Sequence, residues 1–203
     1  FDNHIRVDQP RSWNARATGV NGALDAIFTR PTHHLLGGLA ILDRAKAYLP
    51  QNAKFLSSDL SRARETARAI HNGQHWLSES PEFREMNFGD WDGKPFFEVE
   101  KQNPALWRSF WETPGESAPP KGESWHQLTA RIAAALQALH ASGPQGNIII
   151  TAHFAVILSA LQLATGMPAA AAFSFKINNF SVTKLDYLHE SNNWRVMGVN
   201  ILA

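Results

Sequence analysis

The chain has 203 residues, of which 44% are apolar, so it fits one α/β domain or two small ones with a core of normal size. Its 19 Lys and Arg residues balance 18 Asp and Glu residues, which gives no overall field to attract nucleic acid or an anionic membrane. Because Cys is absent, disulfides, a thiol nucleophile and thiolate metal sites are excluded, and the composition fits a reducing compartment, the cytoplasm. We treat residues 1–203 as a single domain.

The first quarter of the chain predicts a short strand, a long loop and a helix. Residues 3–7 (NHIRV) predict a strand that ends at Asp8. Residues 8–34 are longer than an ordinary connection and rich in loop-forming residues, so they are a candidate functional loop. Apolar residues recur at helical spacing from 35 to 49, and Pro50 ends this predicted core helix.

Residues 55–70 (FLSSDLSRARETARAI) predict a strand that leads into a helix. Arg62 falls in the first turn of this helix, where unpaired backbone N–H groups and the helix dipole favour an anion. A guanidinium group at that point can hold phosphate through two hydrogen bonds. Taken alone, the string is more often that of an exposed arginine on a surface helix. The remaining motifs have to decide between these two interpretations.

The middle of the chain predicts an edge strand, a rim loop and a helical cap. HWLSES, residues 75–80, is the edge strand, and residues 82–93 (EFREMNFGDWDG) have the composition of a rim loop. Two helices that flank Pro104 are expected within a cap insertion at about 94–121. The cap is rich in aromatic residues, which could form a lid over an organic substrate or simply bury themselves against the domain.

The last part of the chain completes an α/β pattern. Ser124 is placed to cap a helix that runs to Leu139. NIIIT, residues 147–151, has the β-branched composition of a buried parallel strand, and a helix follows it up to Gly166. SVTKLDYL and WRVMGVNIL predict two more strands. This alternation favours a doubly wound, mostly parallel sheet with helices on both faces and ligands at the carboxyl ends of its strands.

Three features follow carboxyl ends of predicted strands, and we expect them to converge. They are Asp8, the segment from Ser57 to Arg62, and His153 after NIIIT. A histidine at the top of a central strand, near an arginine from another strand, is suited to phosphate binding or acid-base work. Glu85 in the rim loop could act as a general acid if partial burial raised its pKa, although a single loop glutamate is usually solvated surface.

Five motifs together resemble the histidine phosphatase superfamily, also called phosphoglycerate mutase-like. They are SSDLSRARETA (57–67), REMNFGDWDG (84–93), GES (122–124), IIITAHFAVI (148–157) and NFSVTKL (179–185). Their order and spacing match the family over most of the chain. The finer pattern most resembles α-ribazole phosphatases and similar small-molecule phosphomonoesterases.

The resemblance implies a set of roles in phosphoryl transfer. Members form a phosphohistidine in an Arg-His-Gly motif after the first strand, and water then removes the phosphoryl group. Arg62 resembles a phosphate-binding arginine, His153 the second histidine and Glu85 the proton donor; Ser124 would support the pocket and Arg11 could add a phosphate contact. We expect a small phosphorylated molecule or inorganic phosphate as ligand, without cofactor, metal, nucleic acid or membrane.

The chain departs from the family at two of these motifs. Alignment of Trp13 and Asn14 with the family's tryptophan and asparagine puts Asp8 at the position of the nucleophilic histidine. His153 is followed by Phe154 and Ala155, where the family has two glycines, and the bulk of Phe154 would crowd the pocket.

Three hypotheses about function follow from these departures. In the first, turnover is lost but Arg62, His153 and Arg11 still bind a phosphorylated ligand. In the second, the protein is an active phosphomonoesterase with Asp8 or His153 as nucleophile, although the Asp8 charge would repel a phosphate dianion. In the third, the chain is a non-catalytic interaction module whose aromatic segment, residues 96–111, binds a partner protein.

Overall fold

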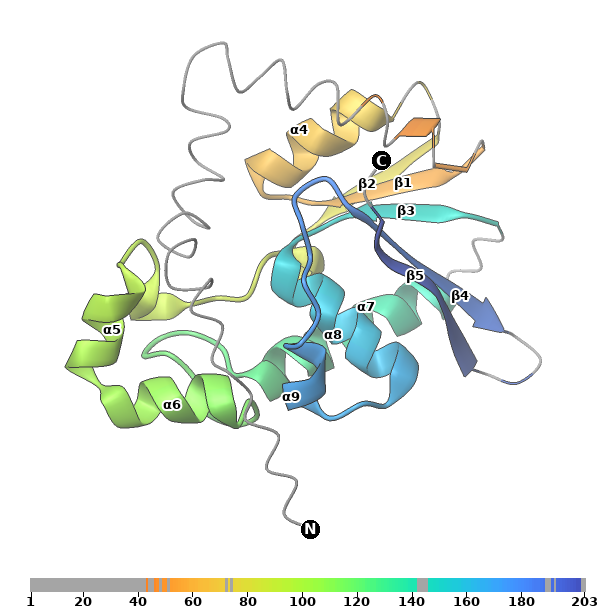
Figure 1. The fold of residues 1–203 in the computed structure, drawn as a ribbon. Coiled ribbons are helices and arrows are strands. Elements are labelled where there is room, and N and C mark those ends of the chain that lie inside the picture. Colours follow the sequence, from red (N-terminus) through yellow and green to blue (C-terminus); the bar gives the residue numbers. More distant parts are fainter. Residues whose placement is uncertain are drawn as a thin grey trace.

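Figure 1 shows a computed structural model, which describes residues 43, 46–47, 49–50, 52–71, 73, 75–141, 146–188, 191 and 193–201. In chain order its elements are β1 (Lys54–Ser58), α4 (Ser61–Ile70), β2 (His75–Ser80), the 3-10 helices η1 (Pro81–Phe83) and η2 (Gly89–Trp91), α5 (Phe96–Gln102), α6 (Pro104–Glu112), α7 (Trp125–Ala141), β3 (Ile148–Thr151), α8 (Phe154–Thr165), α9 (Ala169–Ala172), β4 (Val182–Leu188) and β5 (Asn193–Ile201). The predicted strand at 3–7 and the loop at 8–34 lie outside the described residues.

Three strands form a parallel sheet in the order β2-β1-β3, and α4 and the pair α7 and α8 cover its opposite faces (Figure 1). The α/β fold predicted from the sequence is therefore confirmed. The two C-terminal strands, β4 and β5, pair antiparallel as a hairpin. Among the helices that the structure describes, none has both the length and the apolar character that a bilayer crossing requires.

The side-chain alternation of β1 divides the apolar core between the two faces. Phe55 is fully buried on the α4 side, together with Ile70, and Leu56 is buried in the larger cluster formed with α7 and α8. On α4 the buried residues are Ala63, Ala67 and Ile70, one face at helical spacing. Two of these residues are alanines, so the start of α4 packs close to the sheet.

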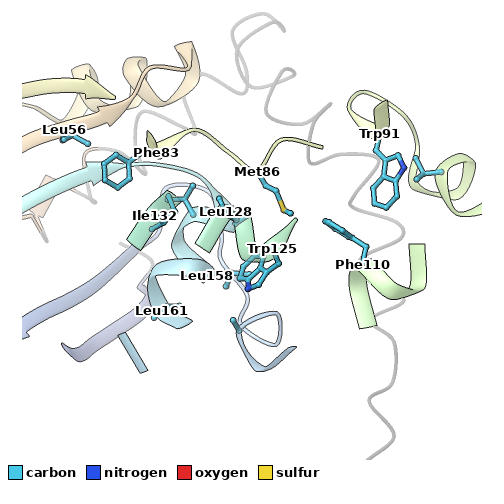
Figure 2. Close-up of a cluster of buried hydrophobic side chains, with 14 residues drawn as sticks. Leu56, Phe83, Met86, Trp91, Phe110, Trp125, Leu128, Ile132, Leu158 and Leu161 are labelled. Carbon is cyan, nitrogen blue, oxygen red and sulfur yellow. The ribbon is translucent and has the colours of Figure 1, made fainter. Parts of the chain in front are cut away.

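Aromatic residues connect α6 to the larger core cluster. The helices α5 and α6 lie to one side of the sheet, and the two helices predicted around Pro104 are confirmed, with Pro104 as the first residue of α6 (Figure 1). Phe110 and Trp91 are 2% and 7% exposed, and their rings are 5.1 Å apart. Figure 2 shows both side chains continuing the apolar cluster that includes Trp125 and Met86. These two aromatic residues are therefore core, whereas Phe97 in α5 is 65% exposed.

Candidate active site

The turn between β1 and α4 places Arg62 at the carboxyl edge of the sheet. β1 ends at Ser58, Leu60 is the N-cap residue of α4, and Arg62 follows in the first helical turn. The Arg62 Nε is buried and has no hydrogen-bond partner in the described part of the chain. A buried guanidinium nitrogen without a partner is costly, so this atom is available to a ligand acceptor.

His153 lies at the corresponding point after the neighbouring strand, β3. It is the N-cap residue of α8 and only 7% exposed, and its Nε2 has no partner among the described residues. Burial, together with the smaller effects of the nearby Arg62 and Arg131 charges, lowers the pKa of His153 to about 3. The imidazole is therefore neutral at pH 7. Arg62 and His153 follow the carboxyl ends of the adjacent parallel strands β1 and β3, so both lie at the same edge of the sheet.

Glu85 reaches the same place from the rim loop. Its Oε1 accepts hydrogen bonds from the backbone N–H of Met86 at 2.9 Å and of Ala155, in the first turn of α8, at 3.1 Å. Removal of the carboxyl group from water raises the pKa of Glu85, against the opposing effects of these N–H donors and of the Arg62 charge. The raised pKa favours the protonated carboxyl group, which is the form that a general acid needs.

Two hydroxyl groups add to the polar edge of the sheet. Ser57 in β1 and Thr151 in β3 are register partners, so their side chains lie side by side on one face. Neither hydroxyl has a hydrogen-bond partner in the described ranges, although Ser57 is 0% and Thr151 is 9% exposed. The sequence motifs did not point to Thr151; the available signal was a polar residue that ends a run of three isoleucines.

An ion pair joins the turn that precedes α4 to the loop that carries Glu85. Arg84 donates to both carboxylate oxygens of Asp59, with Nε to Oδ1 at 2.8 Å and Nη2 to Oδ2 at 2.6 Å. Because Asp59 lies in the turn after β1 and Arg84 directly precedes Glu85, the pair fixes these segments relative to each other. This hydrogen bond to Arg84 also lowers the pKa of Asp59.

Taken together, the edge of the sheet presents an arginine, a neutral histidine, a carboxyl group with a raised pKa and two hydroxyls that have no partner among the described residues. Comparison with known proteins identifies the family to which this arrangement belongs. The sequence profile of the histidine phosphatase superfamily (branch 1) matches residues 39–201. The chain belongs to the histidine phosphatase superfamily. Residues 1–38, which include Asp8 and Arg11, lie outside this match.

Relatives and solved structures agree with this family. An adenosylcobalamin/alpha-ribazole phosphatase of Salmonella typhimurium is 29% identical over 140 residues, which cover 66% of each chain. The Bacillus stearothermophilus protein YhfR has the same fold, with a TM-score of 0.73 and 23% identity over 82% of this chain and 83% of that one. A mycobacterial glucosyl-3-phosphoglycerate phosphatase, solved with inorganic phosphate, is 25% identical with a TM-score of 0.68, covering 82% and 83%.

The structure brings together three of the site residues predicted for this histidine phosphatase homologue, Arg62, Glu85 and His153. Asp8 and Arg11 lie outside the described residues, and their roles stay predictions. Ser124 is 2% exposed and caps α7, as the sequence predicts: its hydroxyl accepts from the Gln127 N–H at 3.2 Å, and its own N–H donates to Gln127 Oε1 at 2.8 Å. A contact between Ser124 and phosphate stays a prediction.

Proposed function

We propose that this protein binds the phosphoryl group of small phosphomonoesters between Arg62 and His153. The observation that carries the proposal is a pair of buried nitrogen atoms, Arg62 Nε and His153 Nε2, that lack partners among the described residues. Buried polar atoms are nearly always hydrogen-bonded, so a buried atom without a partner indicates where a ligand supplies the missing hydrogen bond. Both residues follow carboxyl ends of parallel strands, where ligands of open α/β sheets bind.

The charge of the pocket suits a phosphate rather than a cation or a neutral group. Arg62 is always charged and lies in the first turn of α4, where the helix dipole also favours an anion. A bound phosphate dianion would stabilise the protonated form of His153, because an opposite charge reverses the effect that Arg62 has on it. Binding should therefore draw a proton toward His153 and give a second charged donor.

Glu85 is proposed to protonate the oxygen of the leaving alcohol. Its carboxyl group lies at the start of α8, close to His153, and its raised pKa keeps a proton available. With Asp8 at the position of the family's phosphohistidine, we propose that hydrolysis is several orders of magnitude slower than with a histidine there.

A second candidate, hydrolysis with His153 as nucleophile, is favoured by one observation. The imidazole of His153 is neutral and its Nε2 is free in the described structure, which is the state that a nitrogen nucleophile requires. The Nε2 lone pair would form a bond to phosphorus as the ester P–O bond breaks and Glu85 protonates the leaving oxygen. Water would then attack phosphorus and break the N–P bond; one water proton would return to the Glu85 carboxylate and inorganic phosphate would leave.

The names of the relatives support a small organic phosphate as ligand. Alpha-ribazole phosphatase and glucosyl-3-phosphoglycerate phosphatase both denote enzymes for phosphate esters of organic molecules. A cytoplasmic location, which the cysteine-free composition suggests, belongs to the same proposal.

Titration with inorganic phosphate, followed by ³¹P NMR, tests the proposal. We expect saturable line broadening with the wild type and its loss in His153→Gln. His126→Gln is the matched control, because the His126 side chain is 57% exposed and its Nδ1 already pairs with Glu116, unlike the buried His153. The absence of broadening with the wild type, or equal broadening in both variants, would contradict the proposal. Turnover of an aryl phosphate that depends on His153 would favour the second candidate.

A further inference from the structure

The backbone on both sides of Glu85 is held by one arginine from α7. Arg131 Nη1 donates to the carbonyl oxygen of Glu82 at 2.5 Å and to that of Arg84 at 3.2 Å. The same guanidinium donates to Glu123, with Nη2 to Oε1 at 2.6 Å and Nε to Oε2 at 3.3 Å. The carbonyl that directly precedes Glu85 is therefore fixed to the first part of α7.

Glu123 restrains the backbone on the C-terminal side of Glu85. Its Oε1 accepts from the Asn87 N–H at 2.8 Å, and its own N–H donates to the Asn87 carbonyl oxygen at 2.9 Å. The two loops approach so closely that a side chain on Gly122 would meet the Asn87 carbonyl. Arg131 and Glu123 thus bind residues 82, 84 and 87, which surround Glu85 in the sequence.

The pair is largely removed from solvent, so its geometry is well defined. The side chains of Arg131 and Glu123 are 21% and 16% exposed. A bidentate arginine–carboxylate pair with additional backbone acceptors uses the planar fork of the guanidinium, which a lysine cannot reproduce. The Arg84–Asp59 pair is more open, with Arg84 at 53% exposed. Arg131 and Glu123 are therefore the stronger restraint on this loop.

We propose that the Glu123–Arg131 pair is a positioning device that presents the Glu85 carboxyl group to the pocket at the start of α8. This inference rests on the proposed function. It adds the residues that hold the proton donor of that site in place. It explains why a loop residue reaches the N–H of Ala155 with defined geometry. Without the two side chains, the loop would lose three side-chain-to-backbone hydrogen bonds, at residues 82, 84 and 87, and the carboxyl group would turn toward water.

The charges around Glu85 determine what such a change would do to its protonation. Arg62 from α4 and the N–H groups at the start of α8 favour the carboxylate, as does the N–H of Met86 in its own loop. His153 is neutral, Arg84 is paired with Asp59, and Arg131 is paired with Glu123. Loss of burial is therefore the dominant effect to expect, and it moves the pKa of Glu85 down toward the ordinary value.

The test is the titration of the Glu85 carboxyl carbon, followed by ¹³C NMR and assigned with Glu85→Gln. We expect the midpoint to fall by about one pH unit in Arg131→Lys and in Glu123→Gln. Arg195→Lys is the matched control, because Arg195 pairs with Asp186 at 2.9 Å on the β4–β5 hairpin and should leave the midpoint unchanged. Hydrogen exchange of the Ala155 amide should also accelerate in the two test variants and not in the control.

The outcomes separate this proposal from the proposed function. A wild-type midpoint retained in folded Arg131→Lys would overturn the positioning role, whatever the activity of the protein. If Glu123→Gln fails to fold, Arg131→Lys still decides, because it keeps the positive charge. Failure of the wild type to bind phosphate would contradict the proposed function. The titration of Glu85 could still be measured and would still test the positioning role.

Discussion

Glu85 accepts a hydrogen bond from the backbone N–H of Ala155 at 3.1 Å, although the two residues are 70 positions apart. The bond joins the rim loop to the first turn of the helix that follows His153. It places the candidate proton donor and the candidate phosphate-binding histidine at one end of β3. A change in the loop of Glu85 should therefore affect the chemistry at His153.

The first prediction concerns the position of the family's nucleophile. Replacement of Asp8 by His should create or increase hydrolysis of an aryl phosphate by at least about a hundredfold, because the rest of the pocket already offers Arg62, His153 and Glu85. Release of inorganic phosphate is the measurement. Continued absence of turnover in a folded variant would show that Phe154 or the altered first motif had also disabled the pocket.

The second prediction concerns the leaving group. In the Asp8→His background, Glu85→Gln should slow hydrolysis of an alkyl phosphate by about 10²–10⁴-fold, the usual contribution of a general acid. A p-nitrophenyl ester should be much less affected, since its leaving group departs without a proton. Comparison of kcat for the two substrates measures this difference. Equal losses with both esters would argue against proton donation by Glu85.

The third prediction is a pH dependence of stability. In the folded protein the pKa of His153 is about 3, whereas the unfolded chain takes up this proton near its ordinary value of 6.5. Between these values the unfolded state binds more protons, so the His153 contribution to the free energy of unfolding falls as the pH falls, by about 1.4 kcal/mol per pH unit. The pKa of Glu85 is raised, so its own contribution is present at low pH and lost as the pH rises above 4.5.

Urea unfolding in phosphate-free buffer separates these two contributions. The difference in free energy of unfolding between wild type and His153→Gln should grow from pH 3 to pH 6.5. The difference between wild type and Glu85→Gln should shrink as the pH rises. If the difference between wild type and His153→Gln did not change with pH, the fold would not hold His153 in its neutral form.

The fourth prediction uses the free hydroxyl of Thr151. Thr151→Val keeps the shape of the side chain and removes a buried hydroxyl that has no partner in the described structure. We expect the free energy of unfolding to rise by about 1 kcal/mol without phosphate, since an unsatisfied buried group is costly. Phosphate affinity should fall at the same time. Destabilisation of the variant would show that the hydroxyl has a partner in the free protein.

The fold was predictable from local patterns. The β-branched run before His153 and the strand-to-helix pattern around Arg62 each predicted their elements, and the structure confirms the α/β architecture. Ser124 was also predictable as a helix cap, because a hydroxyl followed by Gln127 three positions later satisfies the first N–H groups. These features depend on residues close in the sequence.

The contacts that hold the site residues in place were not predictable from local patterns. The contact of Arg131 with the carbonyls beside Glu85 joins segments about 50 residues apart and depends on how α7 packs against the rim loop. The pairing of Ser57 with Thr151 depends on the order and register of two strands, which the composition of neither strand shows. The role of Asp8 stays a prediction from the motif alignment.

Binding of inorganic phosphate to Arg62→Ala and Arg68→Ala, measured by isothermal titration calorimetry, tests the account most directly. Both arginines lie in α4, but the Arg68 side chain is 65% exposed and pairs with Glu79, whereas the Arg62 Nε is buried and free in the described structure. We predict wild-type affinity for Arg68→Ala and a loss of at least about tenfold for Arg62→Ala. Equal affinity in the two variants would contradict an anion site at the carboxyl edge of this sheet.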